Sequence, residues 1–323
     1  MPPTSSSVQE RRSVSLVNNG GNSFSPQGVT TLRWVISHES LFFDPKTMAI
    51  SVAMRSAGTP DPDLKLAQSI AGCFRQLTIY AGGTMLERIT DYGRLYTAQR
   101  FLTSTSEAAG QLKIMAGADG TEVADNTASR FILPLWCGLQ GCESLLPLKF
   151  VPLTFQLELC QNYADALDGN VQLPWALEDC RLLCDMVMAH SDVVESLFGA
   201  LAKGSSLNLR IPSVHSFSQT VQNSGMQIIQ ASRSVSRLRM VQIMFSSVAS
   251  GDKPCRAYRI PSGAFEAQMS IGSRDYPQHG SLKSVQEMFY QTMKCLGDVA
   301  CTGSNAVSYT HLRAHETKAK LGC

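Results

Sequence analysis

Short runs in which apolar and polar residues alternate follow one another along this chain, in two successive blocks. The clearest run is residues 153–159, in which leucine and phenylalanine alternate with Thr154, Gln156 and Glu158. A period of two places alternate side chains on opposite faces of a β-strand. Similar runs in the first block lie at residues 32–36, 48–54, 73–80, 84–89, 130–136 and 148–159. The first block is therefore predicted to be a β-sandwich.

Turn residues separate several of these runs. Gly82 and Gly83 lie between two runs and predict a tight hairpin, because glycine adopts a positive φ without a steric penalty. A phosphate-binding role for this pair is disfavoured, since the third glycine and the following helix N-terminus that such a site needs are absent. Asp44 and Pro45 predict another turn, ahead of the run at 48–54.

Apolar residues also recur at helical spacing in two places between the runs. One predicted helix covers residues 91–102, with Thr90 or Asp91 as its N-cap. A second covers residues 192–203 and ends at Gly204. Each helix is predicted to pack on a sheet or to lie at an interface.

The second block is predicted to follow a hinge at residues 165–175, which contains Pro, Asp and Gly. Its strand-like runs lie at residues 180–188, 207–211, 226–231, 235–245 and 265–271. A third amphipathic helix is predicted over residues 281–296. In the first block, residues 104–129 are polar and are expected to form a loop.

These patterns predict a mainly β fold with two antiparallel sandwiches side by side and short inserted helices. The expected division is a flexible N-terminal arm at 1–28, a first sandwich at 29–168 and a second at 169–305. The arm is rich in Ser, Asn, Gly and Pro and has no periodicity, which is typical of a mobile segment. A chain of 323 residues is long enough for two cores.

Residues 306–323 form a tail that does not fit this pattern. Residues 306–317 resemble the in-frame translation of a sequencing-library adapter, so the tail is excluded from the fold prediction. Without its charged residues Arg313, Glu316, Lys318 and Lys320, the formal net charge falls from +2 to zero. The natural C-terminus is then missing, and we expect the second sandwich to be truncated.

Charged residues make up 17% of the chain, against about 25% in an average soluble domain. Large subunit interfaces are depleted in charge at their centres, so a protomer covered by neighbours would have this composition. A charge-poor monomer would give the same count. The cluster Arg210, Arg233, Arg237 and Arg239 is interpreted as the solvated face of a strand, and no basic stripe for nucleic acid is present.

Targeting signals are absent from the sequence. The first twenty residues contain no apolar run that could serve as a signal peptide, so the ten cysteines are expected to be reduced. No Asn-x-Ser/Thr sequon occurs, and no apolar run could span a bilayer. The protein is predicted to be soluble and cytosolic or nuclear.

Residues capable of catalysis or metal binding do not form a motif. The pairs Cys137/Cys142 and Cys180/Cys184 lack the spacing of a zinc knuckle and are interpreted as buried thiols. The remaining candidates, each isolated or commoner in a structural role, are His38, His190, His215, His279, the carboxylate pairs Glu87/Asp91 and Glu158/Asp165, and the turn Asp61-Pro62-Asp63. G-x-S-x-G is absent. We therefore predict no catalytic, cofactor-binding or metal site, and no enzyme activity.

Read together, four stretches resemble the double jelly-roll major capsid proteins of polinton-like viruses, virophages and their endogenous relatives in protist genomes. The stretches are residues 74–96, 146–159, 181–185 and 265–277, the last followed by the helix at 281–296. The resemblance covers about residues 20–300. It implies two jelly rolls per chain, the second one incomplete here.

In that family, three copies form a pseudo-hexagonal capsomer, and capsomers tile an icosahedral shell. The resemblance therefore implies a structural protein of a DNA virus whose main partner is itself, in a homotrimer and then a lattice, with minor capsid or penton proteins as further partners. It implies location in the virion after assembly in the host cytoplasm or nucleus. It also assigns the helices at 91–102 and 192–203 to contacts between subunits, and it carries over no catalytic residue.

The alternative is a two-domain β-sandwich that binds carbohydrate or processes glycans, since jelly rolls host both. Such a protein would usually be exported and would show aromatic side chains in a groove. The tryptophans Trp34, Trp136 and Trp175 lie inside or beside apolar runs instead. A minor shell protein of the vertices is a third reading, but such proteins usually need a single jelly roll.

Overall fold

The computed structural model describes residues 8–58, 63–103, 106–124, 127–169, 172–206, 209–221, 225–231, 237–238, 240–245, 253–256, 266–278 and 280–296. The chain divides into two compact units. The first contains Met1–Thr97, Gly110–Ser218 and Ala249–Arg256, and the second contains the remaining residues. Each unit is described separately.

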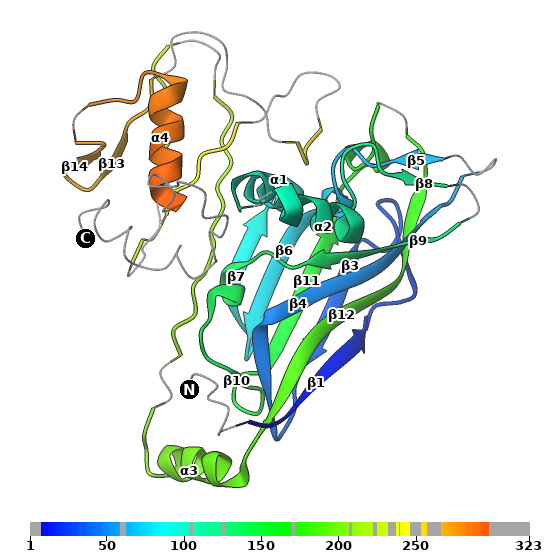
Figure 1. Cartoon of the computed structure of the whole chain (residues 1–323), viewed down its shortest axis with the longest axis vertical. Coiled ribbons are helices and arrows are strands. Elements are labelled where there is room, and N and C mark those ends of the chain that lie inside the picture. Colours follow the sequence, from blue (N-terminus) through cyan, green and yellow to red (C-terminus); the bar gives the residue numbers. More distant parts are fainter. Residues whose placement is uncertain are drawn as a thin grey trace. The chain divides into compact units, whose positions relative to one another are not determined.

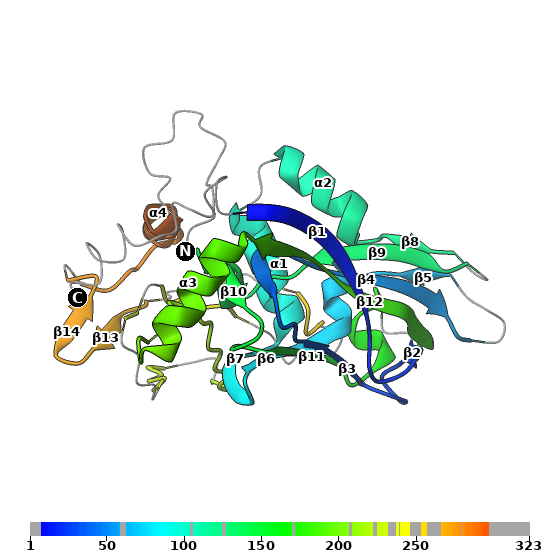
Figure 2. The ribbon, with the colours of Figure 1, turned by 90° about the horizontal axis from the view of Figure 1, so that it is seen from below.

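The first unit is an antiparallel sandwich of two sheets (Figures 1 and 2). One sheet contains β1 (Val8–Val17), β12 (Trp175–Ala189), β4 (Leu41–Ser56) and β10 (Leu146–Pro147), with β2 (Ser23–Phe24) on β12 and β9 (Ser129–Pro134) on β4. The other contains β3 (Thr31–Ile36), β11 (Leu153–Leu159), β6 (Phe74–Ala81) and β7 (Thr84–Thr90). The prediction of a mainly β, antiparallel fold is confirmed.

The core of the sandwich lies between the two sheets. In β11 every second residue is buried, from Leu153 to Leu159, so the predicted alternation is confirmed. Phe155 of this strand approaches Phe43 of β4 in the opposite sheet, with ring centroids 6.2 Å apart. Trp34 and Trp175 are fully buried in the same core. Burial of large apolar side chains from both sheets supplies most of the stabilisation of such a sandwich.

The predicted hairpin is also confirmed. β6 and β7 pair antiparallel, and the turn between them contains Gly82 and Gly83 with φ of 54° and 85°. Residues with a side chain rarely adopt these angles, so glycine is needed at both positions.

Asp44 and Pro45 do not form the predicted turn. They lie inside β4, where residues 45–48 bulge out opposite the single residue Cys184 of β12. The bulge is closed locally: Thr47 Oγ1 donates to the Asp44 carbonyl oxygen at 3.0 Å and accepts from the Asp185 N–H at 2.8 Å. A turn sequence can therefore be absorbed as a bulge when both flanking segments pair with the same strand.

The N-terminal arm predicted at 1–28 is largely ordered. β1 pairs with β12 from Val8 to Val17, and β2 pairs with the other end of β12. Residues 1–7 lie outside the described residues. The sequence does not predict this strand because most of its exposed side chains are polar or charged, as on an edge strand that buries little on either face.

The strand predicted to open the second block belongs to the first unit. β12 lies between β1 and β4 in the six-stranded sheet, so the expected division between residues 168 and 169 falls within this unit. The predicted hinge at 165–175 ends in the buried Trp175, whose Nε1 donates to the Tyr163 carbonyl oxygen at 3.1 Å. Pro, Asp and Gly mark loops in general, and here they occur in a connection between strands of one sandwich.

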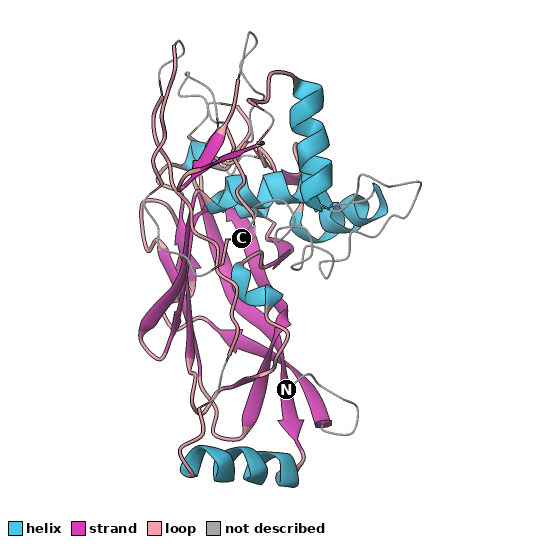
Figure 3. Ribbon diagram, turned by 90° about the vertical axis from the view of Figure 1, so that its left-hand side faces the viewer, coloured by secondary structure: helices cyan, strands magenta, loops and turns pink. Residues whose placement is uncertain are grey.

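Helices occur where the spacing predicted them, at α1 (Tyr92–Thr103) and α3 (Ser191–Ala202). The stretch 104–129, expected as a loop, contains instead α2 (Ser106–Ala116) and β8 (Glu122–Val123), which pairs with β5 (Leu64–Lys65). Short 3-10 turns occur at η1 (Ile70–Cys73), η2 (Gly138–Gly141) and η3 (Tyr163–Asp165). Figure 3 shows the sandwich strands in magenta and α3 beyond one end of them.

The second unit contains the hairpin β13 (Met269–Ile271) and β14 (Arg274–Tyr276), followed by α4 (Val285–Leu296), which confirms the predicted third helix. Ser284 caps this helix by accepting from the Glu287 N–H at 3.1 Å. The predicted strands at 226–231 and 235–245 are not strands in their described parts. In the same stretch Met226, Ile228 and Ile243 are 89%, 70% and 63% exposed.

Candidate assembly surface

The carboxylate pair Glu87 and Asp91 serves the fold. Glu87 is 2% exposed and accepts N–H groups from Gly138 at 2.7 Å, Leu139 at 3.3 Å and Val214 at 3.1 Å. Burial raises the pKa of this carboxyl to about 7, although the backbone hydrogen bonds oppose the shift. Asp91 begins α1, since its carbonyl accepts from the N–H groups of the first turn. Neither residue is presented to a substrate.

Residues 212–216, which we call the β7 strap, lie along β7. His215 forms a parallel bridge with Arg88 of that strand. The hydroxyl of Ser216 accepts from the Thr90 N–H at 2.7 Å and lies 2.8 Å from the Thr90 hydroxyl. Together with the Glu87 contact, these bonds cover an edge of the four-stranded sheet that would otherwise be open to pairing.

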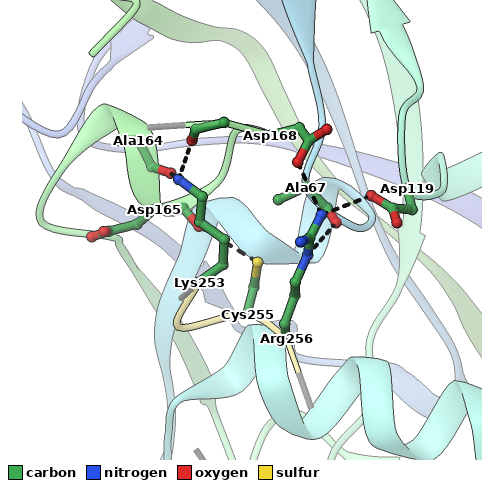
Figure 4. Close-up of polar contacts among 9 residues, drawn as sticks. Ala67, Asp119, Ala164, Asp165, Asp168, Lys253, Cys255 and Arg256 are labelled. Carbon is green, nitrogen blue, oxygen red and sulfur yellow. Dashed lines mark hydrogen bonds and ion pairs between the residues drawn. The ribbon is translucent and has the colours of Figure 1, made fainter. Parts of the chain in front are cut away.

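A second distant segment, residues 253–256, is anchored on the first unit (Figure 4). We call it the clasp. Lys253 is 4% exposed, and its Nζ donates to the carbonyl oxygens of Ala164, at 2.6 Å, and Gly169. A buried ammonium needs such acceptors because its desolvation is costly.

Arg256 completes the clasp. Its guanidinium donates to the Ala67 carbonyl oxygen at 3.3 Å and forms ion pairs with Asp119 at 3.1 Å and Asp168 at 3.0 Å (Figure 4). Between the two cations, the Cys255 thiol is buried and donates to the Asp165 carbonyl oxygen. Sequence reasoning missed the clasp, because its only local signal is two cations three residues apart.

The remaining predicted candidates have structural settings. Glu158 lies in β11, 4.0 Å from Arg75, and Asp165 closes the capping box of η3. Nδ1 of His38 accepts two backbone N–H groups in a turn. His190 precedes α3. Asp61, Pro62, Arg233, Arg239 and His279 lie outside the described residues.

Cys137, Cys142, Cys180 and Cys184 are buried, as the sequence predicted, and so are Cys73, Cys160 and Cys255. Burial raises the pKa of the Cys184 thiol to about 12, and the pKa of Cys137 also lies well above the ordinary value. These side chains are therefore thiols at neutral pH, not nucleophilic thiolates. In the part of the chain that the structure describes, no group of three or more His, Cys, Asp or Glu is placed to hold a metal.

A shallow depression of about 510 Å³ lies over β3. Its lining consists of Asn19, Gly20, Val29, Thr31, Arg33 and Val35. The lining contains neither an aromatic ring nor a pair of carboxylates, which glycan binding and glycan hydrolysis respectively use. Trp34 and Trp175 are fully buried, so these two rings do not line an open groove, and Trp136 is half-buried.

The outer faces of the two sheets differ in charge. On the six-stranded sheet, Arg11 pairs with Asp44 at 2.9 Å and with Asp185 at 3.2 Å. Arg130 and Arg181 both bind Asp179 on the same sheet and hold the pKa of that carboxyl below its usual range. This face is therefore built from closed ion pairs.

On the outer face of the four-stranded sheet, uncharged side chains separate the charged ones. Its cross-strand rows are Val35, Thr154, Tyr80 and Met85; Arg33, Gln156, Thr78 and Arg88; and Thr31, Glu158, Gln76 and Thr90. Exposed apolar side chains occur at Val29, Val35 and Met85, which are 50%, 43% and 47% exposed. Flat faces with little charge at the centre are typical of contacts between subunits.

Helix α3 presents a second apolar surface. None of its residues is buried, and its apolar stripe is only half-covered. The stripe consists of Val193, Val194, Leu197, Phe198 and Leu201. Phe198 packs edge-to-face on Phe150, with centroids 5.4 Å apart, and Lys149 lies 4.7 Å from the same ring. Among the described residues of α1, by contrast, Tyr92, Leu95 and Tyr96 are buried.

No protein-family model and no curated protein matches the chain. Solved structures of viral proteins do match. The PBCV-1 VP54 crystal structure, fitted into a reconstruction of the virophage Sputnik, is 14% identical over 57% of this chain and 43% of that chain, with a TM-score of 0.37. The cryo-EM structure of the Sputnik virophage itself is 10% identical over 57% of this chain and 49% of that chain, with a TM-score of 0.41.

The STIV MCP crystal structure is 11% identical over 55% of this chain and 48% of that chain, with a TM-score of 0.31. The chain thus spans less than half the length of these proteins. It is similar in structure, at low identity, to double jelly-roll major capsid proteins. Among the described residues, no helix is both long and apolar enough to cross a membrane.

Proposed function

We propose that this protein is a shell-forming structural protein: a viral major capsid protein that assembles into trimeric, pseudo-hexagonal capsomers of an icosahedral shell. The observation that carries the proposal is the outer face of the four-stranded sheet, where Thr154, Gln156 and Thr78 at the centre are uncharged. A protomer whose flat face is hidden by a neighbour needs this composition. The low charge of the whole chain, 17%, agrees with it.

The order of the four sequence stretches that resemble double jelly-roll capsid proteins also supports this role. On this proposal the first unit is the first jelly roll, and the C-terminal part of the chain contributes to a second one beside it. The protein is then located in the virion, with copies of itself as its main partner and minor capsid or penton proteins as further partners.

The carboxylate and thiol groups that could serve in catalysis have structural roles in this fold. Glu87 is bound by backbone N–H groups, and the Cys137 and Cys184 thiols are buried with a raised pKa. The depression over β3 lacks the aromatic rings and carboxylates of a glycan site. The proposed role needs none of these groups to react.

The mass of the full chain in solution tests this proposal. One chain has a mass of 35.1 kDa, so we expect a trimer of about 105 kDa in size-exclusion chromatography with light scattering. Gln156→Lys places a charge at the centre of the four-stranded face and is expected to convert the trimer to monomers. Ser15→Lys, on the exposed edge strand β1, is the matched control and should leave the trimer intact.

A strict monomer at tens of micromolar protein would overturn the proposal. So would a trimer that Gln156→Lys and Ser15→Lys disturb equally, since the four-stranded face would then not be the contact. Binding of an oligosaccharide by the monomer would favour the carbohydrate-binding alternative.

A further inference from the structure

The clasp, residues 253–256, and the part of the first unit that holds it have the features of a ligand and its binding site. We propose that this part of the first unit is a preformed socket for a short basic peptide of the pattern Lys-x-Cys-Arg, filled in this structure by the chain's own clasp. A peptide of the same pattern from another molecule enters the socket when the clasp is out. This binding property does not rest on the shell role.

The clasp is distant in the chain from the surface that it contacts. Residues 249–256 belong to the first unit, whereas the residues on both sides of them belong to the second. The hydrogen-bond partners of the clasp lie 84 to 189 positions earlier in the chain. Its bonds to them come from the side chains of Lys253, Cys255 and Arg256. Such a segment is physically a tethered peptide ligand.

The walls of the socket are tied to one another by bonds that do not involve the clasp. The Ala67 N–H donates to the Ala166 carbonyl oxygen at 2.9 Å, and the Asp168 N–H donates to the Lys65 carbonyl oxygen at 2.8 Å. The turn η3, in the same loop, is closed by its own capping box. The acceptors of the clasp are therefore held in place by the first unit itself. A site that keeps its shape when empty binds its ligand with little ordering cost.

A slot between two glycines receives Cys255. A Cβ added at Gly72 would lie 3.2 Å from the Cys255 Cβ and 3.3 Å from its Sγ, and the next nearest atom beyond its chain neighbours, in Ala166, is 3.9 Å away. At Gly93 an added Cβ would meet the Cys255 Cβ at 3.3 Å and the Ala71 carbonyl oxygen at 2.8 Å. The backbone of Gly72 does not adopt a positive φ, so the clasp is the neighbour that most restricts this position. The slot admits a small side chain and excludes a large one.

Polar groups on both sides of the slot select two cations (Figure 4). Two backbone carbonyl oxygens accept from the Lys253 ammonium, which is 4% exposed. On the other side, Asp119 and Asp168 pair with the Arg256 guanidinium. These acceptors lose their donors when the clasp leaves, so they define a ligand with cations at its first and fourth positions.

The tether makes the clasp a strong competitor for its own socket. A short peptide with two charge-assisted anchors is expected to bind with a Kd on the order of 30 µM. A tethered segment has an effective concentration of about 1 mM. The wild type is then mostly self-occupied, and a peptide in solution has an apparent Kd about thirtyfold higher than for an empty socket.

Binding of a labelled hexapeptide to the full-length protein tests the socket. The probe is Asp-Lys-Pro-Ser-Arg-Ala, the sequence of residues 252–257 with serine in place of Cys255. Lys253→Glu combined with Arg256→Glu places carboxylates against the acceptors and so empties the socket. By fluorescence anisotropy, we expect the probe to bind this variant about thirtyfold more tightly than it binds the wild type. Equal affinity for the two proteins, or no binding to the variant, would overturn the proposal.

Two matched comparisons locate the binding. A probe with leucine in place of its serine should bind at least tenfold more weakly, because the slot is too narrow, whereas alanine should be tolerated. In the emptied variant, Gly72→Ala should weaken binding of the serine probe about fivefold. Gly110→Ala, whose added Cβ meets nothing within 4 Å, should leave it unchanged. If the leucine probe binds equally well, or if Gly72→Ala has no effect, the peptide binds elsewhere and the socket is wrong.

A measurement on the wild type covers the case in which the double variant does not fold. Burial raises the pKa of the Cys255 thiol to about 11, so the seated thiol reacts slowly with a thiol reagent. At about 1 mM, the serine probe should displace about half of the clasps and speed the labelling of Cys255 at least fivefold. A Cys255→Ser chain gives the background from other cysteines. An unchanged rate would show that clasp and socket do not separate, and would overturn the proposal.

Discussion

Two regions of this chain are predicted as strands from their sequences and have different structures. In β11, Leu153–Leu159 lies between β3 and β6, and every second side chain is buried. In the second unit, the stretch around Met226 and Ile228 has β-prone composition as well, but these side chains are 89% and 70% exposed and the segment is not a strand. Alternation specifies which side chains share a face, and neighbouring strands decide whether that face is buried.

The difference in burial between the two regions is tested most directly by shortening one apolar side chain in each. Leu157→Ala removes a fully buried side chain from β11, and we expect it to lower the free energy of unfolding by about 3 kcal/mol. Ile228→Ala is the matched change in the second unit and should cost less than about 0.5 kcal/mol. Chemical denaturation followed by tryptophan fluorescence measures both, since Trp34 and Trp175 lie in the core. Equal losses would mean that residue 228 is buried in solution.

The β7 strap follows α3 in the chain and is anchored by the Glu87 carboxyl, which accepts the Val214 N–H. The protonation of this carboxyl makes the stability of the protein depend on pH. The pKa of Glu87 is about 7 in the folded protein and near 4.5 when exposed. The protonated form is therefore favoured by folding, so this group's contribution to stability is complete below pH 4.5 and is lost as pH rises through 7. The loss amounts to about 3 kcal/mol.

Urea denaturation of the wild type and of Glu87→Gln between pH 4 and pH 8 checks this sign. The free energy of unfolding of Glu87→Gln, relative to the wild type, should increase with pH across this window, because the variant lacks the titrating group. A constant difference between the two proteins at every pH would show that Glu87 titrates normally and that the carboxyl is solvated.

The clasp belongs to the first unit, although the residues just before and after residues 249–256 belong to the second. Its loss should therefore affect the stability of the sandwich. Lys253→Met removes a buried ammonium and leaves the carbonyls of Ala164 and Gly169 without their donor. We expect a loss of about 2 kcal/mol and faster reaction of the Cys255 thiol with a thiol reagent, because the segment no longer holds Cys255 in place. Lys283→Met, which removes an exposed ion pair with Glu266, is the control and should cost well under 1 kcal/mol. Unchanged thiol reactivity in Lys253→Met would contradict the anchoring role.

The smallest expected effect lies at the edge of the six-stranded sheet. Arg11→Ala breaks the ion pairs with Asp44 and Asp185, and should destabilise the protein by about 1 kcal/mol at low salt and less at high salt. Arg12→Ala breaks only a local pair with Glu10 and should have no measurable effect. Thermal melts at two salt concentrations distinguish them. If the loss of stability in Arg11→Ala does not depend on salt, it is due to packing of the aliphatic part of the Arg11 side chain.

Local signals explain which parts of the fold were predictable. The alternation of β11, the glycines of the β6–β7 hairpin and the helical spacing of α1, α3 and α4 all act within about a dozen residues. Membership in a sheet does not. β12 was placed in the wrong block and β1 was taken for a mobile arm, because both assignments depend on pairs more than 100 residues apart, such as Ser13 with Asp185. Asp44 and Pro45 became a bulge for the same reason.

The candidate surfaces also divide into those with a local signal in the sequence and those that depend on pairing between distant strands. The helical stripe of α3 could be predicted from its spacing. The composition of the outer face of the four-stranded sheet could not be predicted, because its rows join residues of strands that are distant in sequence. The sequence offers Glu87 as a candidate acid. The structure shows that its carboxylate accepts hydrogen bonds from the backbone N–H groups of Gly138 and Val214.

The clasp also sets an order of events during synthesis. Arg256 binds the carbonyl of Ala67, 189 residues earlier in the chain. At roughly 5–20 residues per second, the ribosome takes on the order of ten to forty seconds to make the intervening polypeptide. The other partners of the clasp, Asp119, Asp165 and Asp168, also precede it in the chain. In the last part of that interval, the surface around Ala67 and Cys73 therefore lacks its last covering segment, and a nascent chain presents it to chaperones or to other nascent chains before the clasp closes it.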